Sequence, residues 1–317
     1  MNLRIGSRGS QLALWQANHI AGLLRGKRHS VEIQIIKTTG DRLQEVTFAQ
    51  VGSKGMFTKE IEEALDVGTI DLAVHSLKDL PTELPEPFAL AATPARVDPR
   101  DVLVSANYAS LSALPQGAKV GTSSQRRRAQ LKALRPDIVA VEFRGNVDTR
   151  LRKLGEGQVD AILLAGAGLD RLGKNEWVRE RLDPAEFCPA AGQGALGIET
   201  RKNDRKTIAA LAFLDDADTR FAVTAERAAL AGLGGGCQVP IGVHCRVVPG
   251  SREGVLDGRW DEVFAVVAAP ETGQAVRILH RAPRAHSDPA LLGSVAAQKL
   301  IEAGAGPLLE AAGGVTK

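Results

Sequence analysis

The sequence predicts two α/β lobes that form a hinged cleft, followed by a smaller C-terminal α+β domain. Strands alternate with helices over residues 3–80 and again over residues 119–164, which is typical of layered α/β domains with a largely parallel sheet. Proline-rich stretches near residues 92–100 and 184–189 interrupt this pattern. After Asp215 the strand–helix alternation ends, and a helix, a glycine-rich loop and segments typical of antiparallel strands follow. Two crossings between α/β lobes create a cleft, where ligands commonly bind.

The 317 residues are enough for two domains of ordinary size or three small ones. We expect domain boundaries at both crossings and after Asp215, where the strand–helix alternation ends. The expected domains are a discontinuous first lobe of residues 1–94 and 195–214, a second lobe of residues 95–194, and a third domain of residues 215–317.

The composition excludes several classes of protein. Hydrophobic residues make up 44% and charged residues 24%, as in ordinary globular proteins. No apolar run approaches the ~20 residues of a membrane span, and the N-terminus does not resemble a signal peptide. The net charge of +3 disfavours a nucleic-acid-binding protein. The three cysteines, which include no CxxC pair, disfavour a disulfide framework and a structural metal site. We expect a cytoplasmic monomer without metal, membrane or nucleic-acid partners.

The first lobe begins with an expected strand at Leu3–Gly6. Ser10 follows a turn and can cap a helix whose apolar residues recur at helical spacing. Residues 31–35 alternate between apolar and polar, which predicts a half-buried strand. Helical spacing returns over residues 58–67, and residues 71–75 form another apolar strand.

The second lobe repeats this alternation, with strands at 119–121, 139–143 and 161–164 and helices at 124–134 and 147–154. Residues 195–199 are expected to return as a strand to the first sheet. In the third domain we expect a helix at 218–230, a glycine-rich loop at 232–236, antiparallel strands at 243–248, 263–269 and 275–279, and a helix at 291–302.

The stretch Gly121–Arg128 (GTSSQRRR) joins a predicted strand to a predicted helix. Backbone N–H groups, small hydroxyls and guanidinium groups meet there at a helix N-terminus, which suits an anion. One alternative is a serine cap followed by an exposed basic turn. A weaker alternative is an RNA-binding patch, because no aromatic residues accompany the arginines.

Other arginines stand where strands end or helices begin. Arg144 precedes a tight turn and Arg150 lies in the next helix, while Arg8, Ser10 and Arg171 occupy similar positions. Arginine binds carboxylates in a bidentate manner, so this placement indicates a ligand with several carboxylates. The alternative is that each arginine is a surface residue in a chain from a GC-rich genome.

The stretch Val74–Pro81 (VHSLKDLP) ends an apolar strand in polar and charged residues before a proline. Lys78 and Asp79 place a base and an acid at a cleft edge, where they can transfer protons or stabilise a cation. A solvated charged turn is the alternative. His75 taken by itself is typical of a packed, hydrogen-bonded histidine.

Cys237 follows three glycines at Gly234–Gly236. A thiol on such a loop can act as a nucleophile or as an attachment point, and a structural cysteine is the alternative. Cys188 and Cys245 lack such a loop and are expected to be buried small residues.

Lys54 lies between Gly52 and Gly55. This pattern resembles a mobile lid over an anion. It is a weak signal, and a loop without function explains it equally well.

Seven blocks, taken together, resemble the hydroxymethylbilane synthase (porphobilinogen deaminase) family. They are Arg8–Ala17, Gly52–Phe57, Val74–Pro81, Gly121–Arg128, Arg144–Arg150, Pro189–Ala195 and Gly235–Gly242. They span roughly residues 3–245. A single block is a weak signal, whereas seven in the family's order are specific.

The resemblance implies two lobes like those of type-2 periplasmic binding proteins and a third domain. It implies a dipyrromethane cofactor that the enzyme assembles from porphobilinogen and holds by a thioether. It also implies the reaction, in which four porphobilinogen molecules are joined head to tail with loss of ammonia. The product, hydroxymethylbilane, is then released by water for haem biosynthesis.

By position, the resemblance assigns the catalytic aspartate to Asp79 and the thioether to Cys237. The residues that it assigns to the cofactor are Lys78, Thr122, Ser123, Ser124, Arg126, Arg127, Arg144 and Gln193. Those that it assigns to the substrate are Arg8, Ser10, Lys54, Arg144, Arg150 and Arg171. Gly234 departs from the pattern, because many relatives have glutamate or another residue there.

Two other hypotheses remain open at this point. The first is a non-catalytic, two-lobed binding protein for a polycarboxylate ligand. Cys237 discriminates against it, because a pure binder has no need of a reactive thiol on a glycine loop. The second is a nucleic-acid-binding protein, which the near-neutral net charge disfavours.

Overall fold

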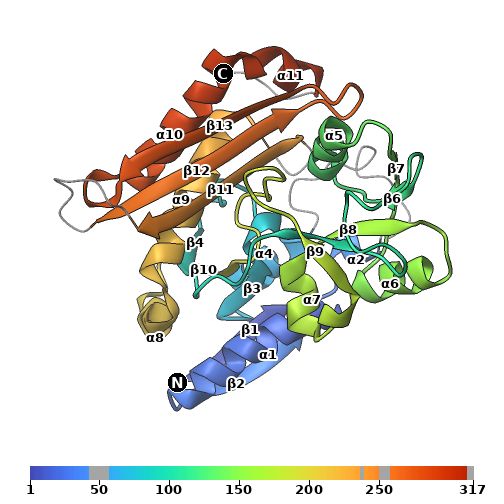
Figure 1. Cartoon of the computed structure of the whole chain (residues 1–317). Coiled ribbons are helices and arrows are strands. Elements are labelled where there is room, and N and C mark those ends of the chain that lie inside the picture. Colours follow the sequence, from blue (N-terminus) through green and yellow to red (C-terminus); the bar gives the residue numbers. More distant parts are fainter. Residues whose placement is uncertain (43–56, 236–238, 250–257, 313–317) are drawn as a thin grey trace. The chain divides into compact units, whose positions relative to one another are not determined.

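The computed structural model describes residues 1–42, 57–235, 239–249 and 258–312 (Figure 1). The chain falls into two compact units. The first contains Met1–Val97, Arg171–Gly173 and Gly194–Arg220, and the second contains Asp98–Asp170, Lys174–Gln193 and Phe221–Lys317. The expected division into three domains stays a prediction.

The first unit is built on a five-stranded sheet in the order β2-β1-β3-β10-β4. The strands are β1 (Asn2–Ser7), β2 (Ser30–Ile35), β3 (Leu72–Ser76), β4 (Phe88–Ala92) and β10 (Leu196–Arg201). β1 pairs in parallel with β2 and β3, whereas β10 runs antiparallel to both of its neighbours. The expected return of the chain to the first sheet is confirmed.

The helices of the first unit are α1 (Gln11–Gly26), α2 (Thr39–Arg42), α4 (Lys59–Asp66), η1 (Leu77–Asp79), α8 (Arg205–Leu211) and η3 (Ala212–Leu214). α1 begins where expected, because Ser10 Oγ accepts a hydrogen bond from the Ala13 N–H at 3.3 Å. Ile20 and Leu24 of α1 are fully buried and pack with Ile5 in the core of this unit.

The second unit contains a sheet of the same design, in the order β7-β6-β8-β5-β9. The strands are β5 (Asp101–Val104), β6 (Lys119–Gly121), β7 (Val139–Val141), β8 (Ala161–Ala165) and β9 (Val178–Arg181). β6 pairs in parallel with β7 and β8, and β5 runs antiparallel to β8 and β9. The helices are α5 (Gln125–Leu134), α6 (Val147–Gly155), α7 (Gly166–Leu172) and η2 (Asn175–Trp177).

These sheets confirm the α/β class but correct one expectation. Both are mixed rather than largely parallel, because β10 and β5 each run antiparallel to two neighbours. Both strands lie close to a crossing of the chain between the units. The sequence also failed to indicate β4, β5 and β9. They are only four or five residues long, β4 directly follows Pro87, and β5 begins two residues after Pro99.

The C-terminal part of the second unit forms an antiparallel sheet, as expected. Its elements are α9 (Ala217–Gly232, beginning in the first unit), β11 (Ile241–Pro249), β12 (Arg259–Ala268), β13 (Ala275–Pro283), η4 (Arg284–His286), α10 (Pro289–Leu300), η5 (Ile301–Ala305) and α11 (Gly306–Ala311). Figure 1 shows α10 along this sheet, where it contacts β12 and β13.

The two faces of β12 pack against different partners, because successive side chains of a strand point to opposite sides. Val263 and Val267 join the core formed with α9 and α10. Phe264 and Val266 pack instead with Cys188 and with residues of α5. The three-stranded sheet is therefore part of the hydrophobic core that supports α5.

Two helical glycines allow a matched test of this packing. A Cβ atom on Gly293 of α10 would lie 2.1 Å from the Ala225 carbonyl oxygen of α9, whereas one on Gly22 of α1 would meet nothing within 4 Å. We expect Gly293→Ala to destabilise the protein by roughly 1–3 kcal/mol. Gly22→Ala should stabilise it by up to about 1 kcal/mol. Thermal unfolding midpoints measure both, and equal midpoints would contradict the close helix contact.

Candidate functional site

A cavity of about 80 Å³ in the first unit brings together several of the predicted residues. Its polar lining residues are Arg8, Ser10, Gln16, Thr58, His75, Ser76 and Asp79. η1 continues from the buried strand β3, and its Leu77 is 1% exposed and donates its N–H to the Ala195 carbonyl at 3.0 Å. This anchor leaves Asp79 exposed at the cavity. No ion pair engages its carboxylate in the part of the chain that the structure describes.

The predicted substrate residues of the first unit differ in their surroundings. Arg8 stacks on Phe57, with 4.0 Å between Cζ and the ring centroid. Ser10 lines the cavity and also caps α1. Arg171 is 8% exposed, and its Nη2 donates to the Gly194 carbonyl at 2.8 Å, but it does not line the cavity. Lys78, which belongs to the predicted cofactor residues instead, is half-buried in η1, beside Asp79.

A buried histidine–carboxylate pair forms part of the cavity wall. His75 Nε2 lies 3.0 Å from Glu199 Oε2, and the two side chains are 7% and 0% exposed. His75 is thus packed and hydrogen-bonded, as the sequence analysis expects of this residue taken by itself. Burial raises the pKa of the nearby Glu62 carboxyl, and Glu199 adds to the rise against the opposing effects of Thr58 and His75. The sequence did not indicate either glutamate.

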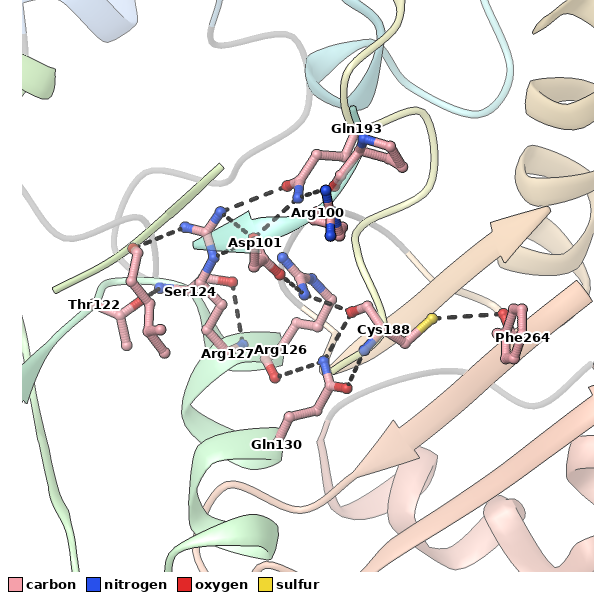
Figure 2. A network of polar contacts seen from close by, with 12 residues as sticks. Arg100, Asp101, Thr122, Ser124, Arg126, Arg127, Gln130, Cys188, Gln193 and Phe264 are labelled. Carbon is pink, nitrogen blue, oxygen red and sulfur yellow. Dashed lines mark hydrogen bonds and ion pairs between the residues drawn. The ribbon is translucent and has the colours of Figure 1, made fainter. Parts of the chain in front are cut away.

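In the second unit, the carboxylate of Asp101 binds three of the predicted cofactor residues (Figure 2). Its Oδ2 accepts a hydrogen bond from Arg126 Nη1 at 2.6 Å. Its Oδ1 accepts from Nε and Nη2 of Arg127 at 2.9 and 2.8 Å and from Gln193 Nε2 at 2.9 Å. Burial acts to raise the pKa of Asp101, but the two guanidinium groups outweigh it and hold that pKa well below its usual range.

The turn between β6 and α5 is organised by its hydroxyl groups. Ser124 Oγ caps α5 by accepting the Arg127 N–H at 3.4 Å, and Thr122 Oγ1 accepts the Ser124 N–H at 3.2 Å. Ser123 Oγ donates to the Phe143 carbonyl at 2.7 Å. The serine cap is therefore confirmed. The alternative of an exposed basic turn is wrong for Arg126 and Arg127, which are 5% and 6% exposed.

Two further predicted arginines lie at the turn from β7 to α6. Arg144 Nε donates to Glu142 Oε1 at 2.7 Å, and Arg150 Nε donates to the Gly145 carbonyl at 2.8 Å. Burial, and after it the Arg127 cation, lower the pKa of Arg150 to about 10, with Arg144 contributing and Glu142 opposing. A guanidinium held among other cations is a group that an anionic ligand would stabilise.

Two predicted residues, Cys237 and Lys54, lie outside the described residues. The other two cysteines, Cys188 and Cys245, are buried as expected, each 2% exposed. Burial raises the pKa of the Cys188 thiol to about 12. Within the described ranges, no cluster of three or more histidine, cysteine or acidic side chains could hold a metal ion. None of the described helices is both long and apolar enough to cross a membrane.

Sequence reasoning missed two fully buried acids of the second unit. Asp101 begins the apolar strand Asp-Val-Leu-Val, and an acid directly before such a strand is the one signal that could have indicated it. Glu226 of α9 accepts the Gly192 N–H at 2.6 Å and the Cys245 N–H at 2.8 Å. It thereby holds the loop that carries Gln193.

The chain is similar to both solved structures and curated proteins. Among solved structures, the methionine-binding protein MetQ covers 71% of this chain and 94% of its own, at 12% identity and a TM-score of 0.42. Among curated relatives, a porphobilinogen deaminase of Trichlorobacter lovleyi is 48% identical over 310 residues, covering 97% of this chain and 96% of the relative. One from Nitratidesulfovibrio vulgaris strain DP4 is 55% identical over 260 residues, covering 81% and 82%.

Two family models match nearly the whole chain. The model described as "Porphobilinogen deaminase, dipyromethane cofactor binding domain" matches residues 3–209. The model described as "Porphobilinogen deaminase, C-terminal domain" matches residues 220–302. The chain therefore belongs to the porphobilinogen deaminase family.

Proposed function

We propose that the chain is a hydroxymethylbilane synthase of porphyrin and haem biosynthesis. It joins four porphobilinogen molecules head to tail, releases one ammonia for each, and frees the linear tetrapyrrole by hydrolysis. The observation that carries this proposal is the pair of family models over residues 3–209 and 220–302. A non-catalytic polycarboxylate-binding protein is not favoured, because the matching family consists of enzymes.

The arginines of the second unit suit a polyanionic cofactor. Arg127, Arg144 and Arg150 lie close enough for the two others to lower the pKa of Arg150, and a dipyrromethane carries an acetate and a propionate on each ring. When bound, this group supplies the free pyrrole α-carbon to which the first substrate unit is joined. The full proposed cofactor set is Lys78, Thr122, Ser123, Ser124, Arg126, Arg127, Arg144 and Gln193, with Cys237 as the thioether residue.

Asp79 is the proposed catalytic residue. When the C–N bond of porphobilinogen with its amine protonated breaks, the electron pair leaves with the nitrogen as ammonia, and the positive charge passes to the pyrrole. A carboxylate beside the pyrrole N–H stabilises that charge and can accept the proton released when the next C–C bond forms. The exposure of Asp79 at a cavity shared with Arg8 and Ser10 supports this role.

The proposed substrate-binding residues are Arg8, Ser10, Lys54, Arg144, Arg150 and Arg171. Their guanidinium, ammonium and hydroxyl groups match the carboxylates that each added pyrrole brings. We further propose that the enzyme acts as a cytoplasmic monomer without nucleic-acid or membrane partners. Its 40 basic and 37 acidic residues are nearly balanced, which supports the absence of a nucleic-acid partner.

The cofactor proposal predicts the mass of the purified protein. Active protein should be heavier than its sequence by a two-pyrrole adduct and should colour with a pyrrole-specific aldehyde reagent. Cys237→Ser should have the sequence mass and no activity, because the thioether needs that sulfur, whereas the control Cys245→Ala should keep the adduct. Intact-protein mass spectrometry decides, and an active protein of unmodified mass would refute the proposal.

The burial of two cysteines predicts how the protein reacts with alkylating reagents. At pH 8, a thiol with a pKa of about 12 is ionised to a fraction on the order of 10⁻⁴. Neither Cys188 nor Cys245 should react with iodoacetamide in the folded, cofactor-loaded protein, and both should react after denaturation. Labelling of Cys237 in the loaded protein, read by peptide mass mapping, would speak against the thioether.

Replacing the proposed catalytic carboxylate predicts a selective loss of turnover. Asp79→Asn should retain the unfolding midpoint of the wild type, because Asp79 is exposed and makes no ion pair with the described residues. Its turnover should fall roughly 10²- to 10⁴-fold. Glu83→Gln, at an exposed carboxylate four residues further on, is the matched control. Near-normal turnover of Asp79→Asn would mean that another group transfers the proton.

A further inference from the structure

The carboxylate of Asp101 joins three separate segments of the second unit. It comes from β5, while Arg126 and Arg127 come from α5 and Gln193 from the loop that leads to β10. Gln193 also donates to the Pro99 carbonyl at 2.7 Å. Figure 2 shows the three side chains converging on this one carboxylate.

The charged groups of this network are buried. One carboxylate, 0% exposed, faces two guanidinium groups that are 5% and 6% exposed. Buried charges are costly unless they are paired, and Asp101 is the carboxylate that both of these cations bind. The pKa of the neighbouring Arg150 is lowered chiefly by burial and next by the Arg127 cation, which places Arg150 within electrostatic reach of this network.

The same carboxylate also fixes the direction of both guanidinium groups. Arg127 binds it through the Nε and Nη2 edge. Arg126 uses Nη1 alone, which reaches both Asp101 and the Cys188 carbonyl, each at 2.6 Å. Within the described ranges, Nε and Nη2 of Arg126 make no hydrogen bond to the protein. A carboxylate that binds one edge of a planar guanidinium group determines where the N–H donors of its other edge point.

We propose that Asp101 is the positioning residue for cofactor assembly: it orients Arg126, Arg127 and Gln193 toward the carboxylates of the dipyrromethane. This inference rests on the proposed function, and it concerns a residue that touches only other residues of the protein. It distinguishes Arg126 and Arg127, which Asp101 binds directly, from Arg150, which binds the Gly145 carbonyl instead.

The test follows cofactor assembly directly. Cofactor-free protein, produced in cells that cannot make porphobilinogen, is incubated with porphobilinogen, and the two-pyrrole adduct is timed by intact-protein mass spectrometry. Asp101→Asn should gain the adduct roughly 10- to 100-fold more slowly than the wild type, at a temperature well below its unfolding midpoint. A wild-type rate of assembly would overturn the proposal.

A second buried aspartate of the same unit provides the matched control. Asp261 is 0% exposed and binds Arg284 at 2.7 Å, with no part in the proposed cofactor set. Asp261→Asn should lower the unfolding midpoint but assemble the adduct at the wild-type rate. Equal slowing in both variants would reduce Asp101 to a structural residue and overturn the proposal.

Two further outcomes are decided in the same assay. If Asp101→Asn does not fold, Asp101→Glu keeps the charge and moves the carboxylate by one methylene. The positioning role then predicts slow assembly, and a wild-type rate overturns it. If the wild-type protein gains no adduct, the proposed function itself is wrong and the inference falls with it. Normal wild-type assembly with an unaffected Asp101 variant contradicts the inference only.

Discussion

The ion cluster of Asp101 with Arg126 and Arg127 is the interaction on which the candidate cofactor site depends. Taking a carboxylate and two guanidinium groups out of water is costly, and only close pairing with full hydrogen bonding offsets that cost. Here the pairing distances are 2.6–2.9 Å, and the acid stays ionised despite its burial. The cluster therefore forms a rigid, charged support beneath the β6–α5 turn.

The rigidity extends into the backbone on either side of the cluster. Gln130 donates to the Cys188 carbonyl at 2.9 Å and accepts the Cys188 N–H at 2.7 Å, so α5 holds the segment that leads to the second crossing. Glu226 performs a similar task from α9, since it binds the N–H groups of Gly192 and Cys245. In the first unit, by contrast, Asp79 lies exposed at a small cavity beside a buried His75–Glu199 pair. The second unit thus gathers buried arginines around one carboxylate, whereas the cavity of the first unit exposes the carboxylate of Asp79.

The sequence predicted the regular elements well and the buried charges poorly. The caps at Ser10 and Ser124 and the helical spacing located α1 and α5, since both serines accept a backbone N–H at a helix start. The helix α6 was also expected, but its cap at Asn146 was not. The directions of β5 and β10 could not be predicted, because strand pairing depends on segments distant in the chain. Asp101 and Glu199 were missed because acids are normally exposed, and their partners come from other segments. The motifs indicated the arginines of the site, whereas the carboxylate that orients two of them emerged only from the fold.

The inserted strand β10 has a consequence for how the chain is made. β4 pairs with β10 and lies at the edge of its sheet, so the first sheet cannot close until residues 196–201 have left the ribosome. The sheet of the second unit needs only residues 101–181, all of which are synthesised earlier. Domains generally fold as units during synthesis, from the N-terminus onward. In this chain the later-starting sheet is the first to have all its strands, and the N-terminal strands must wait, incompletely paired, for their last partner.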